Sequence, residues 1–112
     1  MDNKKADSYY IKKIATDLAF IIEHTRFLTQ AELEENEVLI DSVMFRLIQV
    51  AENSDKLTDV FKCNHSYIPW RAMKGMRNRI VHEYGNVDLA VVYDTVKNDI
   101  PELLCKLEEI AK

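Results

Sequence analysis

The feature that most constrains the fold of this chain is a helical spacing of apolar residues, with very little along the chain to interrupt it. Between about residues 4 and 28, apolar side chains recur every three or four residues, which predicts one face of a helix. The stripe consists of Ile11, Ile14, Leu18, Ile21, Ile22 and Leu28. A content of 47% hydrophobic residues with only 2 Gly and 2 Pro in 112 residues is typical of a packed helical bundle, and not of a disordered or all-β chain. We therefore predict an all-α fold in a single domain over residues 1–112.

A second, longer helix is predicted from about residue 37 to residue 61. It is preceded by Thr29 and Glu32, which have the spacing of a capping box and predict a short extra helix between the first two main helices. The long helix is apolar on more sides than one core contact requires. Its apolar residues are Val38, Leu39, Ile40, Val43, Met44, Phe45, Leu47, Ile48 and Val50. A second buried face, used between subunits, is the expected reason.

Two more helices complete the predicted bundle. Pro69 suits the first position of a third helix that runs to about Tyr84, where a Gly-Asn pair stops it. Asp88 can cap a fourth helix, in which Pro101 should cause a kink or a restart with Asp99 or the preceding turn as the cap. The expected architecture is an antiparallel four-helix up-and-down bundle.

The charges are unevenly distributed along the chain. Fifteen basic and 19 acidic residues give a net charge of −4. No acidic residue lies between Asp59 and Glu83, whereas five basic residues do, so the rest of the chain has a balance of −9. The five are Lys62, Arg71, Lys74, Arg77 and Arg79. Such a basic stripe can hold a phosphate backbone or an acidic partner, although a solvated helix face that lacks acids is the simpler alternative.

The run Arg77 to Tyr84 contains an arginine where a structural helix would not need one. On a helical wheel, Met73, Ile80 and Tyr84 fall within one apolar arc, and Arg77 falls on the same side. Burying a guanidinium without a partner costs several kcal/mol, so Arg77 requires an anion, an array of carbonyls or another subunit. This conflict between position and residue type predicts a functional site.

Other classes of function find little support in the sequence. No stretch approaches the roughly 20 apolar residues that cross a bilayer, and the first residues lack an apolar core, so we expect a cytoplasmic protein. Cys63 and Cys105 are isolated, which favours reduced structural thiols over a disulfide or a metal pair. We predict no metal site and no cofactor.

The motif Arg77-x4-His82-x-Tyr84, with Asn78 beside the arginine, resembles the R-x4-6-H signature of HEPN domains. In particular, it resembles the R-x4-H-x-Y form of the HepT-like toxins, and the similarity covers nearly the whole chain. Glu52, which follows Ala51, falls where many members of that family have Gly-Glu. The flanking segments that also resemble the family are Ile68-Pro69-Trp70-Arg71, Gly75-Met76, Val87-Asp88-Leu89 and Asp99-Ile100-Pro101-Glu102-Leu103.

The resemblance implies a homodimer in which two copies of the motif meet in a cleft and cleave RNA without a metal, with Arg77 and His82 as catalytic residues. HepT-like toxins are paired with an MntA-like minimal nucleotidyltransferase, an antitoxin that silences the toxin by adenylylating the motif tyrosine. On this chain the modified residue would be Tyr84.

These residue types suit RNA cleavage. The 2′-hydroxyl needs a base, the departing 5′-oxygen needs an acid, and the transition state needs positive charge. A two-fold dimer would bring a second Arg77 and a second His82 to one cleft, since the two lie about 140° apart on one helix and do not share a face. Asn78 precedes His82 by four residues and can orient the imidazole or contact phosphate. The flanking phosphates would be held by Arg71, Lys74 and Arg79.

Simpler roles remain open for several of these residues. His82 can be a helix cap or a surface residue, and Tyr84 an aromatic residue of the core or interface. Glu52 is either an interface hydrogen-bonding group or the partner of Arg77. Trp70 can stack on a base, although a core role is the simpler one.

Two other functions compete with a ribonuclease toxin. One is a non-catalytic binding module that docks a minimal nucleotidyltransferase and presents Tyr84 or a nucleotide to it. The other is a structural dimer, which leaves the inward Arg77 unexplained.

Overall fold

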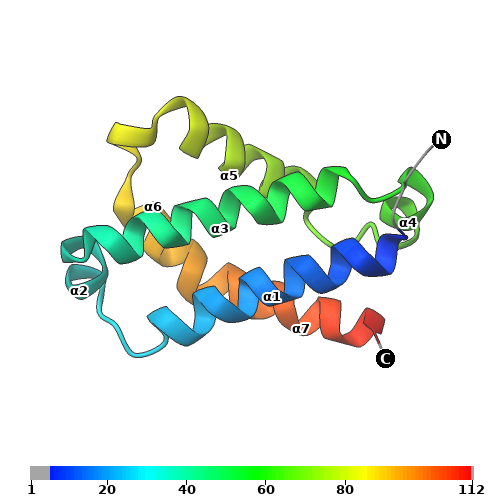
Figure 1. Ribbon diagram of the computed structural model, residues 1–112, viewed down its shortest axis with the longest axis horizontal. Coiled ribbons are helices and arrows are strands. Elements are labelled where there is room, and N and C mark those ends of the chain that lie inside the picture. Colours follow the sequence, from blue (N-terminus) through cyan, green and yellow to red (C-terminus); the bar gives the residue numbers. More distant parts are fainter. Residues whose placement is uncertain (1–5, 112) are drawn as a thin grey trace.

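The helices lie side by side along the molecule, and the computed structural model describes residues 6–111 (Figure 1). Every regular element in this part of the chain is helical. The elements are α1 (Asp7–Thr25), α2 (Gln30–Glu35), α3 (Glu37–Asp55), α4 (Asp59–Asn64), α5 (Trp70–His82), the 3-10 turn η1 (Tyr84–Asn86), α6 (Leu89–Asp94), the π-helical turn η2 (Thr95–Asp99) and α7 (Ile100–Ala111).

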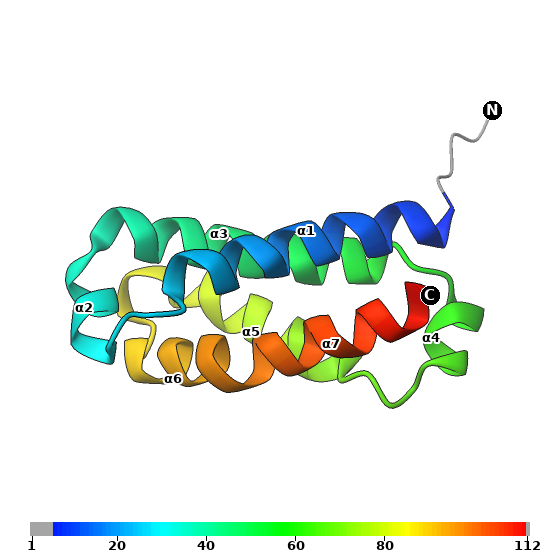
Figure 2. The same ribbon diagram turned by 90° about the horizontal axis from the view of Figure 1, so that it is seen from below.

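The central helix of the bundle is α3, with α1 and α5 on opposite sides of it (Figure 1). α7 packs against α1, and Figure 2 shows α6 and α7 running along the other side of the α1–α3 pair. The core between them is formed by side chains that are almost fully buried, because each helix turns its apolar stripe inward. These include Ile14, Leu18, Ile21, Val43, Ile80, Val92 and Leu107. The predicted all-α, four-helix up-and-down bundle is confirmed, and α2 is the predicted short extra helix.

Two predicted helix caps are confirmed. The backbone N–H of Thr29 donates to Oε1 of Glu32 at 2.9 Å, and the backbone N–H of Glu32 donates to the Thr29 hydroxyl at 3.2 Å, which completes the capping box. The hydrogen bond from the Thr29 backbone holds the pKa of Glu32 below its usual value. At the start of α6, the Asp88 carboxylate accepts from the backbone N–H of Ala90 at 3.0 Å.

The first helix is shorter than the range 4–28 predicted for it. Residues 4 and 5 lie outside the described residues, and α1 ends at Thr25, so the prediction was wrong at the C-terminal end. The Lys97 ammonium group donates to the carbonyl oxygens of Thr25 at 2.7 Å and Arg26 at 2.9 Å. A cation from a helix far along the chain thus satisfies the carbonyls that end α1.

The predicted helix 37–61 is two helices, since α3 ends at Asp55 and α4 begins at Asp59. Thr58 causes the break. Its hydroxyl accepts from the backbone N–H of Phe61, and its own backbone N–H and hydroxyl both donate to the Asp7 carboxylate, at 2.9 and 2.8 Å. Thr58 is thus a local N-cap that divides the predicted helix, and its contact with Asp7, 51 positions away, holds this cap against the start of α1.

The third helix also differs from its predicted bounds. Pro69 is the N-cap of α5 and not its first residue, and the helix ends at His82, before Tyr84. Glu83 leaves the helical conformation, and Tyr84 begins the 3-10 turn η1. The rotation of 100° per residue used to place Tyr84 on the apolar arc does not hold beyond His82.

Pro101 changes the helical pitch without breaking the helix. The turn before it, η2, is π-helical, and the backbone N–H of Ile100 donates to the carbonyl of Thr95. Proline has no N–H to donate, so the widened turn accommodates the missing bond while the chain continues into α7. Of the two caps expected for this restart, Asp99 was wrong, because its side chain accepts no hydrogen bond in the described part of the chain; the preceding turn continues directly into α7.

Candidate functional site

The candidate site lies where α5 packs along α3. The two helices run antiparallel, and three polar contacts join them: Tyr84 to Asp41, Arg77 to Glu52, and Lys74 to Asp55. Figure 1 shows α5 lying alongside α3. We name this surface the α3–α5 face. Its contacting residues are Asp41, Glu52 and Asp55 from α3, and Lys74, Arg77 and Tyr84 from α5 and the turn that follows it. Helical spacing puts Phe45 and Val81 on the same face, because each follows a contacting residue, Asp41 or Arg77, by four positions.

Arg77 is held by two neighbours on this face. Its Nε donates to Oε1 of Glu52 at 3.1 Å, its Nη2 lies 2.9 Å from the same oxygen, and its Nη1 donates to Oδ1 of Asn78 at 3.0 Å. The side chain is 34% exposed, so the guanidinium is paired without being sealed from solvent. Of the two roles left open for Glu52, the structure shows the partner of Arg77. Two of the five guanidinium N–H donors are used in hydrogen bonds, so Arg77 retains donors for a phosphate.

Asn78 contacts Arg77 and not His82. The two roles predicted for it were to orient the imidazole or to contact phosphate, on the basis of the four-residue spacing. The structure shows no hydrogen bond from Asn78 to His82 among the described residues; its amide oxygen accepts from the Arg77 guanidinium instead. A contact with phosphate stays a prediction.

His82 is the last residue of α5 and is exposed. Within residues 6–111, no hydrogen bond or ion pair of its imidazole is found, and it does not contact Arg77 of the same chain. This agrees with the angular separation expected from the sequence. One chain therefore presents a paired cation and, at the end of the same helix, an exposed imidazole.

Tyr84 is 51% exposed, so its expected place on the apolar arc was wrong. Its hydroxyl donates to Oδ1 of Asp41 on α3 at 2.8 Å. This hydrogen bond, with smaller contributions from desolvation and from the negative charge of Asp41, raises the pKa of Tyr84 above its usual value.

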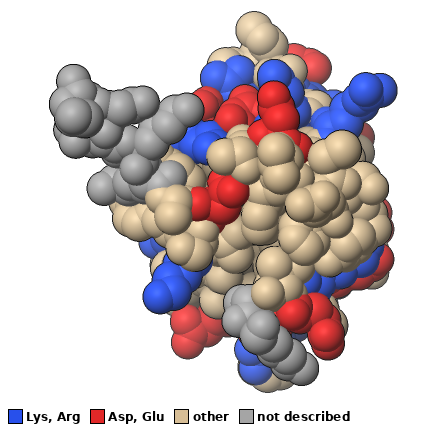
Figure 3. Space-filling view, turned by 90° about the vertical axis from the view of Figure 1, so that its right-hand side faces the viewer, with Lys and Arg blue, Asp and Glu red and all other residues tan. Residues whose placement is uncertain are grey.

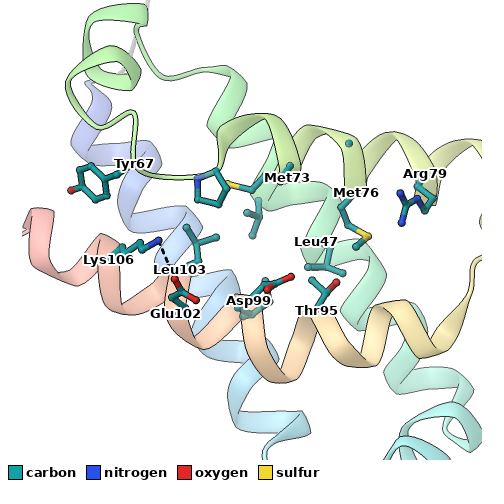
Figure 4. A pocket seen from close by; sticks show the side chains of 15 residues that line it. Leu47, Tyr67, Met73, Met76, Arg79, Thr95, Asp99, Glu102, Leu103 and Lys106 are labelled. Atoms are coloured by element: carbon teal, nitrogen blue, oxygen red, sulfur yellow. Dashed lines mark ion pairs between the residues drawn. The ribbon is translucent and has the colours of Figure 1, made fainter.

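The predicted basic residues do not form one continuous surface. Arg71 is exposed, and the Lys74 ammonium lies 3.8 Å from Asp55. Arg79 is on the other edge of α5, where it lines a groove of about 570 Å³ between α5 and the η2–α7 segment (Figure 4). Segregation of charge along the chain is therefore not segregation in space, since acids of α3 lie against the bases of α5.

The groove has an apolar floor and a polar rim. Leu47 and Val50 of α3 form part of the floor, and Met73 and Met76 extend into it from α5. In Figure 4, Asp99, Glu102 and Lys106 line the opposite edge, with Lys106 and Glu102 paired at 3.1 Å. Figure 3 shows the end of the molecule near α4, where basic and acidic side chains mix near the upper edge above a broad uncharged area.

Asp41 and the groove were not found by sequence reasoning. Asp41 is one of many acidic residues, and nothing in its spacing links it to Tyr84, 43 positions later. The only signal that could have found it is the register of α3 on α5, which the sequence pattern does not fix.

The remaining candidate residues, Trp70 and the two cysteines, have contacts that are structural or, among the described residues, no bonding partner. The indole N–H of Trp70 donates to the carbonyls of His65 and Lys62, which ties it to the end of α4. Cys63 and Cys105 are free and exposed. No group of three or more His, Cys, Asp or Glu side chains within residues 6–111 is arranged to hold a metal ion. Within the same range, no helix combines the length and apolar character needed to cross a membrane.

An all-helical bundle with an Arg-x4-His run at the end of one helix fits the HEPN class of proteins, and the tyrosine two residues later fits its HepT-like form. A family model described as "Ribonuclease HepT-like" matches residues 14–110. The chain belongs to this family.

Individual relatives resemble the chain over most of its length. It is 34% identical to "Probable ribonuclease HepT" of Thermococcus cleftensis over 109 residues, which cover 97% of this chain and 99% of that protein. A "Putative RNase" of Caldanaerobacter subterraneus subsp. tengcongensis is 29% identical over 90% of each chain. In Methanocaldococcus jannaschii, a "Gamma-glutamylcyclotransferase and putative RNase" is 30% identical over 97% of this chain, which corresponds to 48% of that longer protein. No solved structure shows a significant match.

Proposed function

We propose that this chain is a metal-independent endoribonuclease, the toxin of a toxin–antitoxin pair, acting in the cytoplasm as a homodimer. The observation that carries the proposal is Arg77, half-buried and fixed by Glu52 and Asn78, on the same helix as the exposed and unbonded His82. Membership of the ribonuclease HepT-like family and the names of its relatives support RNA as the substrate.

The proposed reaction uses the nucleophile that RNA carries. His82 of one protomer accepts the proton of the 2′-hydroxyl as its oxygen bonds to phosphorus. The bond from phosphorus to the 5′-oxygen breaks, and the imidazolium of the other protomer protonates the departing oxygen. Arg77 neutralises the charge that develops on the phosphoryl oxygens, a role in which a guanidinium is superior to an ammonium because it donates two parallel hydrogen bonds.

The α3–α5 face supports the dimer. The register set by the Tyr84–Asp41 and Arg77–Glu52 contacts puts Phe45 and Val81 between them, and these two side chains are 57% and 42% exposed. An apolar centre with a polar rim is the usual composition of a subunit interface. A two-fold axis through this centre would bring two copies of Arg77 and His82 into one cleft.

Silencing by an MntA-like nucleotidyltransferase fits the position of Tyr84. Its exposed hydroxyl is accessible to a partner enzyme, and it lies on the same face as Arg77. An adenylyl group attached there would add a negative charge and bulk where the RNA backbone is expected to pass, so it would oppose RNA binding.

The test is cleavage of a labelled RNA in EDTA by the unmodified protein, beside Arg77→Ala and His82→Ala. His24→Ala and Arg26→Ala are matched controls, because both residues are exposed and lie at the end of α1, outside the α3–α5 face. Each site variant is expected to lose at least about 100-fold in rate, and the controls should cleave like the parent chain. No cleavage by a folded, unmodified dimer would favour the docking module, and intact mass shows whether Tyr84 carries AMP.

The dimer has a separate test. Phe45→Asp puts a charge in the apolar centre of the α3–α5 face and is expected to give a monomer that does not cleave RNA. Val60→Asp is the matched control, since Val60 is 70% exposed on α4 and lies away from that face. Mass from light scattering decides, and a Phe45→Asp protein that remains dimeric would place the interface elsewhere.

A further inference from the structure

The hydrogen bond between Tyr84 and Asp41 has no role in the proposed RNA cleavage. Both residues are exposed, so water would satisfy a tyrosine hydroxyl at this position. The hydroxyl is instead held by a carboxylate from another helix at 2.8 Å. A carboxylate bound to the hydroxyl of a nucleophile is the arrangement by which protein kinases accept the proton of the hydroxyl they phosphorylate.

We propose that Asp41 is the proton acceptor for Tyr84 when the Tyr84 hydroxyl attacks an electrophilic phosphorus, and that this chain therefore supplies the base for its own modification. The inference rests on the proposed adenylylation of Tyr84. The phosphorus is the α-phosphate of a nucleoside triphosphate, delivered by the partner transferase. The bond from Tyr84 Oη to this phosphorus forms, the bond from the phosphorus to the bridging oxygen breaks, pyrophosphate leaves, and the phenolic proton passes to Oδ1 of Asp41.

The geometry meets the two needs of such a step. The donor–acceptor distance is within the range for direct proton transfer, and the bond fixes the direction of the Oη–H group and thus of the lone pairs that attack. Asp41 also disfavours a free phenolate, because its negative charge is adjacent. Proton transfer and attack on phosphorus must then be concerted, as in a general-base step.

The product differs from the reactant at the same contact. Once Oη carries a phosphodiester it has no proton to donate, and an anion stands beside the Asp41 carboxylate. The hydrogen bond between Tyr84 and Asp41 is therefore lost on modification, and the phosphodiester and the Asp41 carboxylate repel each other.

The probe is diisopropyl fluorophosphate, a phosphorus electrophile that needs no transferase and releases fluoride. Labelling of each tyrosine is followed by peptide mass at neutral pH in the parent chain, in Asp41→Asn and in Asp41→Glu. Tyr67 is an internal control, because it is 56% exposed and belongs to the loop before α5. We expect Asp41→Asn to slow labelling of Tyr84 at least about tenfold and to leave Tyr67 unchanged, and Asp41→Glu to restore part of the rate. Equal labelling of Tyr84 in the parent chain and Asp41→Asn overturns the proposal.

A second measurement separates a base from a merely structural partner. Above the pKa of Tyr84, hydroxide ionises the phenol, so the reaction no longer needs Asp41 as a base. The negative charge of Asp41 then only hinders the labelling reaction. Asp41→Asn is then expected to react as fast as the parent chain or faster. The other titratable groups nearest in sequence are His82 and Glu83 at the end of α5 and Glu37 on α3, and they are unchanged by the substitution. If Asp41→Asn is equally slow at neutral and alkaline pH, the substitution has displaced Tyr84, and the role of Asp41 as the base is overturned.

RNA cleavage by the same preparations distinguishes the two proposals. Labelling that depends on Asp41 without any RNA cleavage overturns the ribonuclease and supports this inference. Cleavage together with labelling that is independent of Asp41 does the reverse. An MntA-like transferase is then added with ATP. AMP transfer to Tyr84 is expected to depend on Asp41 in the same way as the labelling.

Discussion

The two edges of α5 both carry basic residues, but these residues have different contacts on the two edges. On the edge towards α3, three polar side chains are paired across the helix boundary: Lys74, Arg77 and Tyr84. On the edge towards α7, Arg79 lines an open groove with Met73 and Met76, and no ion pair of Arg79 is found in the described residues (Figure 4).

The difference indicates which arginine is already oriented for catalysis before RNA binds. A side chain already fixed by a carboxylate and an amide loses little further freedom when it binds a phosphate, so its geometry is available at the moment of reaction. An arginine without such partners contributes charge but little orientation. We expect substitution of Arg77 to change catalysis, and substitution of Arg79 to change RNA affinity.

The largest expected difference is between Arg77→Lys and Arg79→Lys, which keep the charge on both edges. Lysine cannot reproduce the Nε and Nη1 bonds to Glu52 and Asn78, so Arg77→Lys should lose about 100-fold in the RNA cleavage rate. Arg79→Lys should change the rate less than about threefold. Single-turnover cleavage compares the two, and equal losses would remove the distinction between the edges.

An intermediate effect is expected for Glu52→Gln. Glutamine retains an acceptor of similar size but loses the charge that orients Arg77, so kcat should fall about tenfold. KM for RNA should stay the same or decrease, because one negative charge has been removed beside the phosphate path. Steady-state kinetics separate the two constants. If KM rises while kcat is unchanged, Glu52 does not position Arg77 for catalysis.

Lys74→Ala should have a smaller effect on the same edge. Lys74 and Asp55 are both more than half exposed and 3.8 Å apart, so the free energy of unfolding should change by less than about 0.5 kcal/mol. If Lys74 contacts phosphate, the slope of log Kd against log salt concentration for RNA binding should decrease by about 1. Fluorescence titration at several salt concentrations measures the slope, and an unchanged slope removes Lys74 from the RNA contacts.

The smallest effect at neutral pH is expected for Asp41→Asn, which removes the charged partner of the Tyr84 hydroxyl. The raised pKa of Tyr84 means that folding favours the neutral phenol, so the stabilisation is fully present below the ordinary pKa near 10 and is lost as the pH rises through the folded pKa. Asp41→Asn should lower the pKa of Tyr84 towards the ordinary value. Phenolate absorbance, with Tyr84→Phe to assign the signal, tests this, and an identical titration in Asp41→Asn would show that the bond is absent in solution.

The fold was largely predictable because local signals decide it. The apolar spacing, the Thr29–Glu32 capping box and Asp88 were all interpreted correctly. The errors lie at helix boundaries, and one of these boundaries is set by a distant residue. The end of α1 is held by Lys97, 72 positions later, so no residue near Thr25 signals it. The start of α4 has a local N-cap in Thr58, which the predicted helix 37–61 ran through and which Asp7 also holds.

The candidate site was predicted only in part, for a related reason. The sequence identified Arg77 as a residue in conflict with its position and left two roles open for Glu52, one of them the partner of Arg77. The structure shows this ion pair. The sequence could not find Asp41, nor show that Asn78 faces Arg77. It also placed Tyr84 on an apolar arc, because it extended α5 past its end at His82.

By itself, the sequence determined the class of fold, the caps of α2 and α6 and the motif, because each depends on residues within one or two turns of one another. Only the tertiary structure decided which acids of α3 meet which residues of α5. That pairing depends on how two helices slide along each other, and a slide of one turn moves every contact by about 5 Å while leaving each apolar stripe inward. The partners of Arg77 and Tyr84 are therefore a property of the packed bundle.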